Sequence, residues 1–186
     1  MQNTGIDTFD TLVRQKKELT NSLIDYWKDY SDFSTWQFWL IVAMFLVPLI
    51  ILYFKIDKNK IFLIGFYGYS IHMAFAYIDI SGINLGFWNY PYKLIPALPS
   101  FSLDSSLVPV TFMLVYQWTL NHKKNFYIYS TIAAIIFAFI FKPILASANL
   151  FRMYDGTNFF HLFLIYVFVF LIAKFLTNLF LKLHKS

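Results

Sequence analysis

The sequence contains no cysteine, and its other shortages are nearly as informative. Without cysteine this chain has no disulfide, no thiolate nucleophile, no site for lipoprotein-type acylation and few means of building a structural zinc site. Charged residues are scarce, at 13% of 186 residues, whereas hydrophobic residues make up 59% and aromatic residues 22%. A soluble domain of this size is less apolar, so the composition predicts an integral membrane protein.

Motifs for several classes of active site are also missing from the sequence. The four histidines are scattered and show no metal-ligand spacing. There is no glycine-rich phosphate loop, no serine elbow and no repeat of voltage-sensing arginines. We therefore expect no metal and no cofactor. The net charge of +5 does not favour nucleic acid, because the basic residues cluster beside hydrophobic runs, where membrane lipids are the better partners.

Five apolar runs follow a polar N-terminal segment, and each approaches the length needed to cross about 30 Å of hydrocarbon. We expect an all-α fold: an integral membrane bundle of five transmembrane helices at residues 36–186, preceded by an amphipathic helix within residues 1–35. That helix is predicted to lie on the membrane surface or, equally, to pack on the protein's own loops. The predicted spans are Trp36–Phe54, Ile61–Ile80, Asp104–Leu120, Phe126–Phe141 and Asn158–Leu181.

Lysines between the apolar runs predict the orientation of the chain. They lie at residues 55–60, at residues 123–124 and after the last run, and with five spans these three places share one side. The positive-inside rule makes that side cytoplasmic. The N-terminal segment, with four basic and six acidic residues, and the loops at 81–103 and 142–157 are then outside. We therefore predict an N-terminus outside the cell and a C-terminus in the cytoplasm.

Polar side chains within the predicted spans are candidate functional groups, because lipid cannot satisfy them. In the second span, His72 and Asp79 share a face with small residues, which suits either a packing seam or a proton-accepting or ligand-binding pair. In the fourth span, small residues four apart lead to Lys142 at the outer end. We expect Lys142 to pair with Asp79 or Asp104, unless it is a snorkelling lysine beside a packing ridge.

The third span carries two further polar side chains besides Asp104 at its start. Thr111 shares a face with Asp104, and Gln117 lies toward the cytoplasmic side, where an interhelical hydrogen bond is more common than a ligand contact. Asp104 is expected to cap the helix N-terminus, and Pro109 is expected to kink the helix.

The loop before the third span is rich in proline and aromatic residues, unlike a plain membrane anchor. Its prolines are Pro91, Pro96 and Pro99. We expect this loop to form a rigid, partly embedded outer cap over an outward-facing pocket. The residues that could converge there are Asp79, Trp88, Tyr90, Asp104, Lys142 and His161.

A spaced pattern runs from the second span to the end of the third. Its positions are Asp79, Gly82, Trp88, Tyr90, Pro91, Pro96, Pro99, Asp104, Pro109, Val110, Leu114, Tyr116 and Gln117. Over about residues 36–143 the chain resembles a family of uncharacterised multi-pass membrane proteins from spore-forming Gram-positive bacteria. The family often has Glu-Pro where this chain has Lys142-Pro143. The resemblance implies a bacterial cell membrane protein and no particular activity.

Three functions stay open at this point. The first is a non-enzymatic membrane protein that binds a lipid, a small apolar ligand or a partner, including a second copy of itself, at the outer pocket. The second is a proton- or ion-coupled transporter that uses Asp79 and His72. The third, suggested by a fainter similarity to short helical isoprenoid cyclases, is an enzyme with Asp104 or Asp79 as general acid. Lys142 weighs against the third, because a lysine partner opposes the raised carboxyl pKa that acid chemistry needs.

Overall fold

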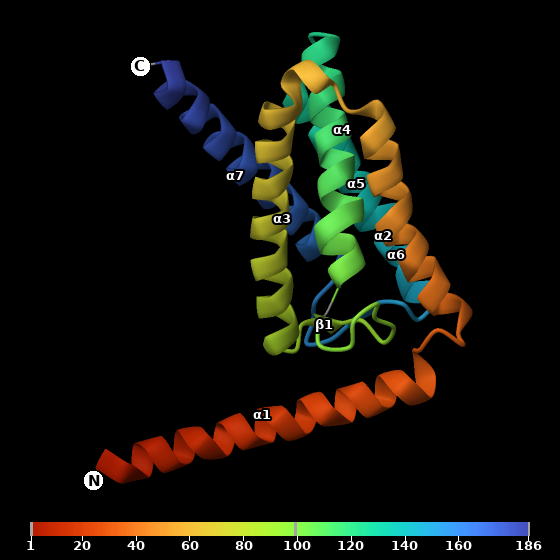
Figure 1. Ribbon diagram of the computed structural model, residues 1–186, viewed down its shortest axis with the longest axis vertical. Coiled ribbons are helices and arrows are strands. Elements are labelled where there is room, and N and C mark those ends of the chain that lie inside the picture. The colour runs from red at the N-terminus through yellow and green to blue at the C-terminus, as the bar shows by residue number, and fades with distance from the viewer. Residues whose placement is uncertain (1, 99, 186) are drawn as a thin grey trace.

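The structure, a computed structural model, describes residues 2–98 and 100–185 and is almost entirely helical (Figure 1). This confirms the all-α prediction; Pro99 lies outside the described residues. The helices are α1 (Gln2–Tyr30), α2 (Trp36–Lys55), α3 (Ile61–Asn84), α4 (Val108–Asn121), α5 (Phe126–Ile136), α6 (Lys142–Ser147) and α7 (Phe159–Lys185). Short turns are η1 (Lys58–Lys60), η2 (Leu103–Leu107) and η3 (Phe137–Phe141), and a two-stranded antiparallel ribbon joins β1 (Trp88–Asn89) to β2 (Arg152–Met153).

The helices from α2 to α7 form one bundle, and α1 crosses beneath one end of it (Figure 1). α4 packs against α2, α3 and α5, and α7 packs against α3 and α5. The ribbon and its flanking loops lie at the end nearest α1, which we call the α1 end. The turns between α2 and α3 and between α4 and α5 lie at the opposite end, together with the C-terminus (Figure 1).

Among the residues that the structure describes, four helices are long and apolar enough to cross a membrane. They cover Trp36–Lys55, Lys58–Asn84, Phe126–Ser147 and Phe159–His184. The predicted span at Asp104–Leu120 is helical but is not one of the four. α4 is less apolar per residue than α2, α3, α5 and α7. Many of its own side chains are buried in the bundle, namely Val108, Pro109, Val110, Phe112, Met113, Tyr116 and Thr119.

Two prolines inside the bundle each follow a widened, π-helical turn. Pro109 follows η2, and Pro143 follows η3. A proline ring clashes with the carbonyl four residues before it and offers no N–H, and a π-helical turn accommodates both effects. Asp104 lies within the first of these turns and Lys142 directly after the second. The N-cap position is Ser102, so Asp104 is not the cap residue itself; it lies in the first turn, where a negative charge suits the helix N-terminus.

Close packing at a glycine joins the second and third predicted spans. A Cβ atom placed on Gly68 would lie 2.2 Å from Sδ of Met113, so the absent side chain is what lets α3 and α4 approach. Nearby, the rings of Tyr67 and Tyr116 lie 4.5 Å apart, centroid to centroid. The small-residue face predicted for the second span therefore includes a true packing seam at Gly68.

The segment from residue 85 to residue 98, which we call the aromatic cap, covers the α1 end of the bundle. Three hydrogen bonds tie it to the chain around α1: Trp27 Nε1 to Lys93 O at 2.8 Å, Lys93 N to Ser31 Oγ at 3.2 Å, and Gln37 Nε2 to Tyr92 Oη at 3.2 Å. The C-terminal end of α1 is thus fixed against the cap, while the rest of α1 extends past the bundle (Figure 1).

Candidate functional site

One buried carboxylate in α3 holds the aromatic cap. Asp79 is 2% exposed, and its Oδ1 accepts hydrogen bonds from Trp88 Nε1 at 2.8 Å and from Tyr90 Oη at 2.9 Å. Its Oδ2 accepts from Ser100 Oγ at 2.7 Å. A carboxylate that accepts several hydrogen bonds in a buried site is stabilised in its charged form. Asp79 is therefore the anchor that binds the cap to the bundle.

Lys142 reaches this carboxylate through a tyrosine. Its ammonium donates to Tyr90 Oη at 2.9 Å and lies over the Phe151 ring, 3.9 Å from the centroid. Burial, and after it the charge of Asp79, raises the pKa of Tyr90 well above its usual value, so Tyr90 stays protonated. Tyr90 therefore accepts from Lys142 and donates to Asp79. Among the described residues Lys142 forms no direct ion pair with Asp79 or Asp104, so the predicted pairing is indirect.

Asp104 adds a second buried acid beside the first. It is 6% exposed and interacts electrostatically with Asp79 and Lys142. Within the described part of the chain, its Oδ1 has no hydrogen-bond partner. The site therefore holds two buried carboxyl groups and one lysine ammonium, so the lysine can balance the charge of only one carboxylate. We call Asp79, Asp104, Lys142 and Tyr90 the acid–lysine cluster.

His72 joins the edge of the cluster through the backbone of Asp104. Val108 N–H bonds back to Leu103 O in the π-helical turn, so the next carbonyl, that of Asp104, would need an N–H from Pro109. Proline has none, and His72 Nδ1 lies 2.8 Å from the freed carbonyl oxygen. Because a carbonyl oxygen only accepts, Nδ1 carries the hydrogen and donates it. The histidine thus replaces the missing helical donor.

The remaining predicted site residues lie elsewhere. Thr111 donates to Leu107 O in its own helix at 2.7 Å. His161 Nδ1 accepts from the backbone N–H of Asn158 at 3.3 Å and lines a groove between α3 and α7, with Trp88 between it and the cluster. The structure therefore brings together Asp79, Trp88, Tyr90, Asp104 and Lys142, and it leaves Thr111 and His161 outside.

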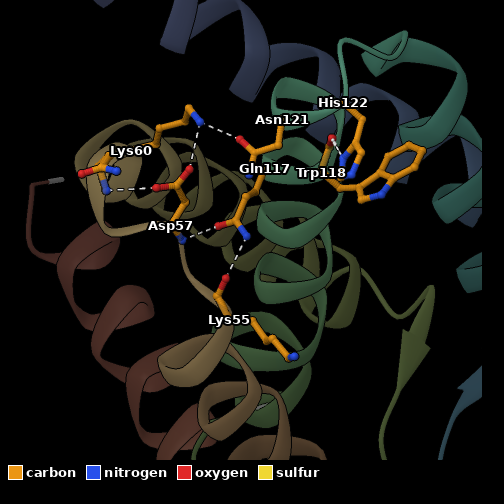
Figure 2. Close-up of polar contacts among 8 residues, drawn as sticks. Lys55, Asp57, Lys60, Gln117, Trp118, Asn121 and His122 are labelled. Atoms are coloured by element: carbon orange, nitrogen blue, oxygen red, sulfur yellow. Dashed lines mark hydrogen bonds and ion pairs between the residues drawn. The ribbon is translucent and has the colours of Figure 1, made fainter.

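Gln117 lies at the opposite end of the bundle and has a structural role there (Figure 2). Its Oε1 accepts from Asp57 N at 2.8 Å, and its Nε2 donates to Lys55 O at 2.9 Å. In the same network Lys60 Nζ donates to Asp57 Oδ2 at 2.8 Å and to Asn121 Oδ1 at 2.6 Å (Figure 2). Gln117 therefore fastens the α2–α3 turn to α4, as its predicted interhelical role requires.

A larger pocket opens on the other side of Tyr90. The cavities that touch the acid–lysine cluster measure about 20 and 10 Å³, which leaves room for a water molecule at most. The pocket between α1 and the cap measures about 460 Å³, a size usual for small-molecule sites. It is lined by Leu23, Tyr26, Trp27, Asn89, Tyr90, Pro91, Tyr92, Lys93, Asn149, Arg152 and Tyr154. We call it the α1–cap pocket.

Several contributors to these sites were missed by sequence reasoning. Ser100 and Phe151 carried no signal, because nothing in the sequence places a loop serine or a loop phenylalanine beside Asp79 or Lys142. Lys93 and Arg152 also carried no signal, because a single cation in a loop does not by itself indicate a site. Lys174 did carry a signal, since a lysine amid an apolar run marks a polar contact; it donates to Tyr116 Oη at 3.0 Å.

Comparison with family models, curated proteins and solved structures gives no match to this chain. The family resemblance noted in the sequence therefore stays a prediction.

Proposed function

We propose that this chain is a multi-pass membrane protein that binds a lipid or a small amphiphilic molecule, without catalysis, in the α1–cap pocket. The observation that carries the proposal is the pocket itself. It has a volume of about 460 Å³, and aromatic rings and two cationic side chains line it. Such a mixture of aromatic walls and a few polar groups is typical of ligand sites, and aromatic side chains with polar tips prefer the membrane interface.

The membrane arrangement is part of the proposal. Besides the four candidate spans, α4 with η2 would cross as a fifth helix, shielded by α2, α3 and α5 so that its polar groups avoid lipid. The lysines at 55–60 and 123–124 lie at the end opposite α1 (Figure 1). The positive-inside rule then puts that end in the cytoplasm and the α1–cap pocket outside a bacterial cell.

The apolar face of α1 supports its proposed place on the membrane surface. Leu23 and Trp27 line the pocket, so this face of the helix turns toward the bundle end. By helical spacing, Phe9, Leu12 and Leu19 lie on the same face, and each is more than half exposed. A helix that crosses the end of a membrane bundle with its apolar side toward the bundle would rest on the lipid surface.

Binding is favoured over catalysis because the acid–lysine cluster is covered. The cavity beside Asp79 and Lys142 holds at most a water. Asp79 already accepts hydrogen bonds from Trp88 and Tyr90 of the cap and from Ser100, which follows the cap. A ligand in the pocket would meet Tyr90 before either acid. We propose that the cluster fastens the cap and so forms the floor of the pocket.

A proton-coupled transporter is the second candidate. The observation that favours it is the unpartnered Oδ1 of Asp104 beside Asp79, with His72 on the Asp104 carbonyl. Buried acids inside membrane proteins are a usual element of proton relays. This function needs the cap to open, because the cavities at the cluster are too small for a substrate.

Native mass spectrometry of the gently extracted protein tests the proposed binding. We expect one retained lipid or small amphiphile per chain, and loss of that adduct when Tyr154→Ala and Tyr26→Ala remove two aromatic walls of the pocket. The matched control is Tyr69→Ala and Tyr127→Ala, which remove two exposed tyrosines outside the pocket. A protein that carries no adduct, or one whose adduct survives in the pocket variant, would contradict the proposal.

A further inference from the structure

The polar groups of the α1–cap pocket offer hydrogen-bond donors and positive charge but no acid. The lining residues include Lys93 and Arg152, and none of them is Asp or Glu. The nearest acids of α1, Asp25 and Asp29, are on the far side of the helix from Leu23 and Trp27 by helical spacing. The lining therefore has the electrostatic character of an anion site.

Lys93 is a cation held in place by its backbone and left without a partner. Its N–H and C=O are bonded to Ser31 and Trp27, so the position of the residue is fixed. No hydrogen bond or ion pair within the described residues satisfies its ammonium. Burial lowers the pKa of Lys93, against the opposing charge of Asp79. A half-buried ammonium without a counter-charge is stabilised when an anion arrives.

Arg152 supplies a second cation to the lining of the pocket. It lies in β2, where it pairs with Asn89 of β1, and its Nη2 donates to Asn149 Oδ1 at 3.0 Å. A guanidinium has five N–H donors in a planar fork, so most remain available for a ligand. Such a fork matches the oxygens of a phosphate or carboxylate in pairs.

The neutral polar groups of the lining are also set as donors. Asn149 Oδ1 accepts from Arg152, and Asn89 Oδ1 accepts from Tyr90 N at 2.8 Å, which leaves the NH₂ group of each amide to donate. Tyr92 Oη already accepts from Gln37, so its own hydrogen is free for another acceptor. A ligand that satisfies these donors must itself carry many hydrogen-bond acceptors.

We propose that the α1–cap pocket binds a phosphate-bearing anion, with Lys93 and Arg152 as its two cationic ligands. This inference rests on the proposed binding function and names the chemical class of the ligand. A phospholipid headgroup and a free phosphate compound share this chemistry. The exposed apolar face of α1, which runs on from the pocket, fits the acyl chains of the first source, and the experiment separates the two.

The test uses the full chain in nanodiscs that contain equal amounts of phosphatidylglycerol and phosphatidylcholine, followed by native mass spectrometry. We expect preferential retention of phosphatidylglycerol. Lys93→Gln and Arg152→Gln should each lower the affinity about tenfold, because each removes a charge-assisted hydrogen bond to the ligand. Lys123→Gln with Lys124→Gln, at the opposite end of the bundle, removes two charges, as many as the two pocket substitutions together, and should leave binding unchanged. Unchanged thermal unfolding of each variant establishes that it is folded.

Inorganic phosphate, added in a titration, distinguishes the two sources. In the first outcome, phosphate displaces the retained lipid, and the displacement depends on Lys93 and Arg152. In that case the pocket takes a soluble phosphate compound and the inference stands. If phosphate does not compete, the source is the lipid headgroup. Equal retention of both lipids, with no effect of the two glutamine variants, overturns the inference while the proposed binding of an amphiphile survives. Retention of neither lipid and no binding of phosphate overturns both.

Discussion

Two lysines in the bundle each donate to a tyrosine hydroxyl, yet their surroundings differ. Lys142 bonds Tyr90 at 2.9 Å, and Lys174 bonds Tyr116 at 3.0 Å, and each ammonium also lies over aromatic rings. Lys142 is fully buried beside two acids, whereas Lys174 is half-buried and forms no ion pair among the described residues. The same contact therefore serves to balance charge at one site and to extend a lysine along apolar surface at the other.

The largest effect is expected when the acceptor at the first lysine site is removed. Asp79→Ala leaves three buried donors without their acceptor and removes one of the two acids near Lys142, so it should destabilise the protein by about 3–5 kcal/mol. Thermal unfolding in detergent measures this. Asp104→Ala is the matched control and should have a smaller effect, because Oδ1 of Asp104 has no partner, whereas both oxygens of Asp79 accept hydrogen bonds. Equal effects of the two substitutions would break the account of Asp79 as the anchor.

Removing each lysine in turn compares the two sites directly. Lys142→Met leaves the two acids unbalanced and should cost about 2–4 kcal/mol, whereas Lys174→Met should change stability by less than about 1 kcal/mol. The measurement is again thermal unfolding, with both variants in the same detergent. A larger loss for Lys174→Met than for Lys142→Met would mean that the acids do not define the first site.

A packing change near the acid–lysine cluster sharpens the role of the cap. A Cβ atom on Gly82 would lie 2.1 Å from the Trp88 ring, so Gly82→Ala should displace the tryptophan and cost about 1–3 kcal/mol. Gly65→Ala is the control, since nothing lies within 4 Å of its Cβ position. Increased accessibility of Trp88 to a soluble quencher in the first variant alone would support the account; identical quenching in both would count against it.

The smallest effect concerns pH at the far end of the bundle. A hydrogen bond from Lys60 lowers the pKa of Asp57 below its usual value. Because the folded pKa is depressed, the stabilisation is present above the unfolded pKa of about 4 and is lost as pH falls through the folded value. Hydrogen exchange of the α2–α3 turn should therefore speed up slightly below about pH 4. The pH dependence of exchange should weaken in Lys60→Met. The same pH profile in this variant and in the unaltered protein would refute the role of the Lys60–Asp57 hydrogen bond.

Much of the helical framework could be predicted from the sequence, because apolar runs and their polar breaks depend on local composition. The span predicted at Trp36–Phe54 corresponds to α2 at Trp36–Lys55. The span predicted at Asn158–Leu181 corresponds to α7 at Phe159–Lys185. The number of membrane spans was harder to predict from the sequence than the positions of the helices. A central helix shielded by others, such as α4, needs less apolar surface than one facing lipid.

The candidate site could be predicted only in part, for reasons of chain geometry. Helical spacing placed Asp79 and Lys142 at one end of the bundle, but the donors that reach Asp79 come from a loop whose path no periodicity fixes. Tyr90 was expected in a pocket; its position between the acid and the lysine depends on how the cap folds back. The π-helical turns before Pro109 and Pro143, which set the positions of Asp104 and Lys142, also lie beyond a simple helical reading.

Cysteine accessibility gives the most direct test of the central claim, that the α1–cap pocket opens on the outside of the membrane. The chain has no cysteine, so the unaltered protein serves as the unlabelled control. Tyr154→Cys places a thiol in the wall of the pocket, and Lys124→Cys places one at the opposite end. With a membrane-impermeant maleimide on intact cells, we expect labelling of Tyr154→Cys, and labelling of Lys124→Cys only after permeabilisation. The reverse pattern, or equal labelling of both in intact cells, would contradict the account.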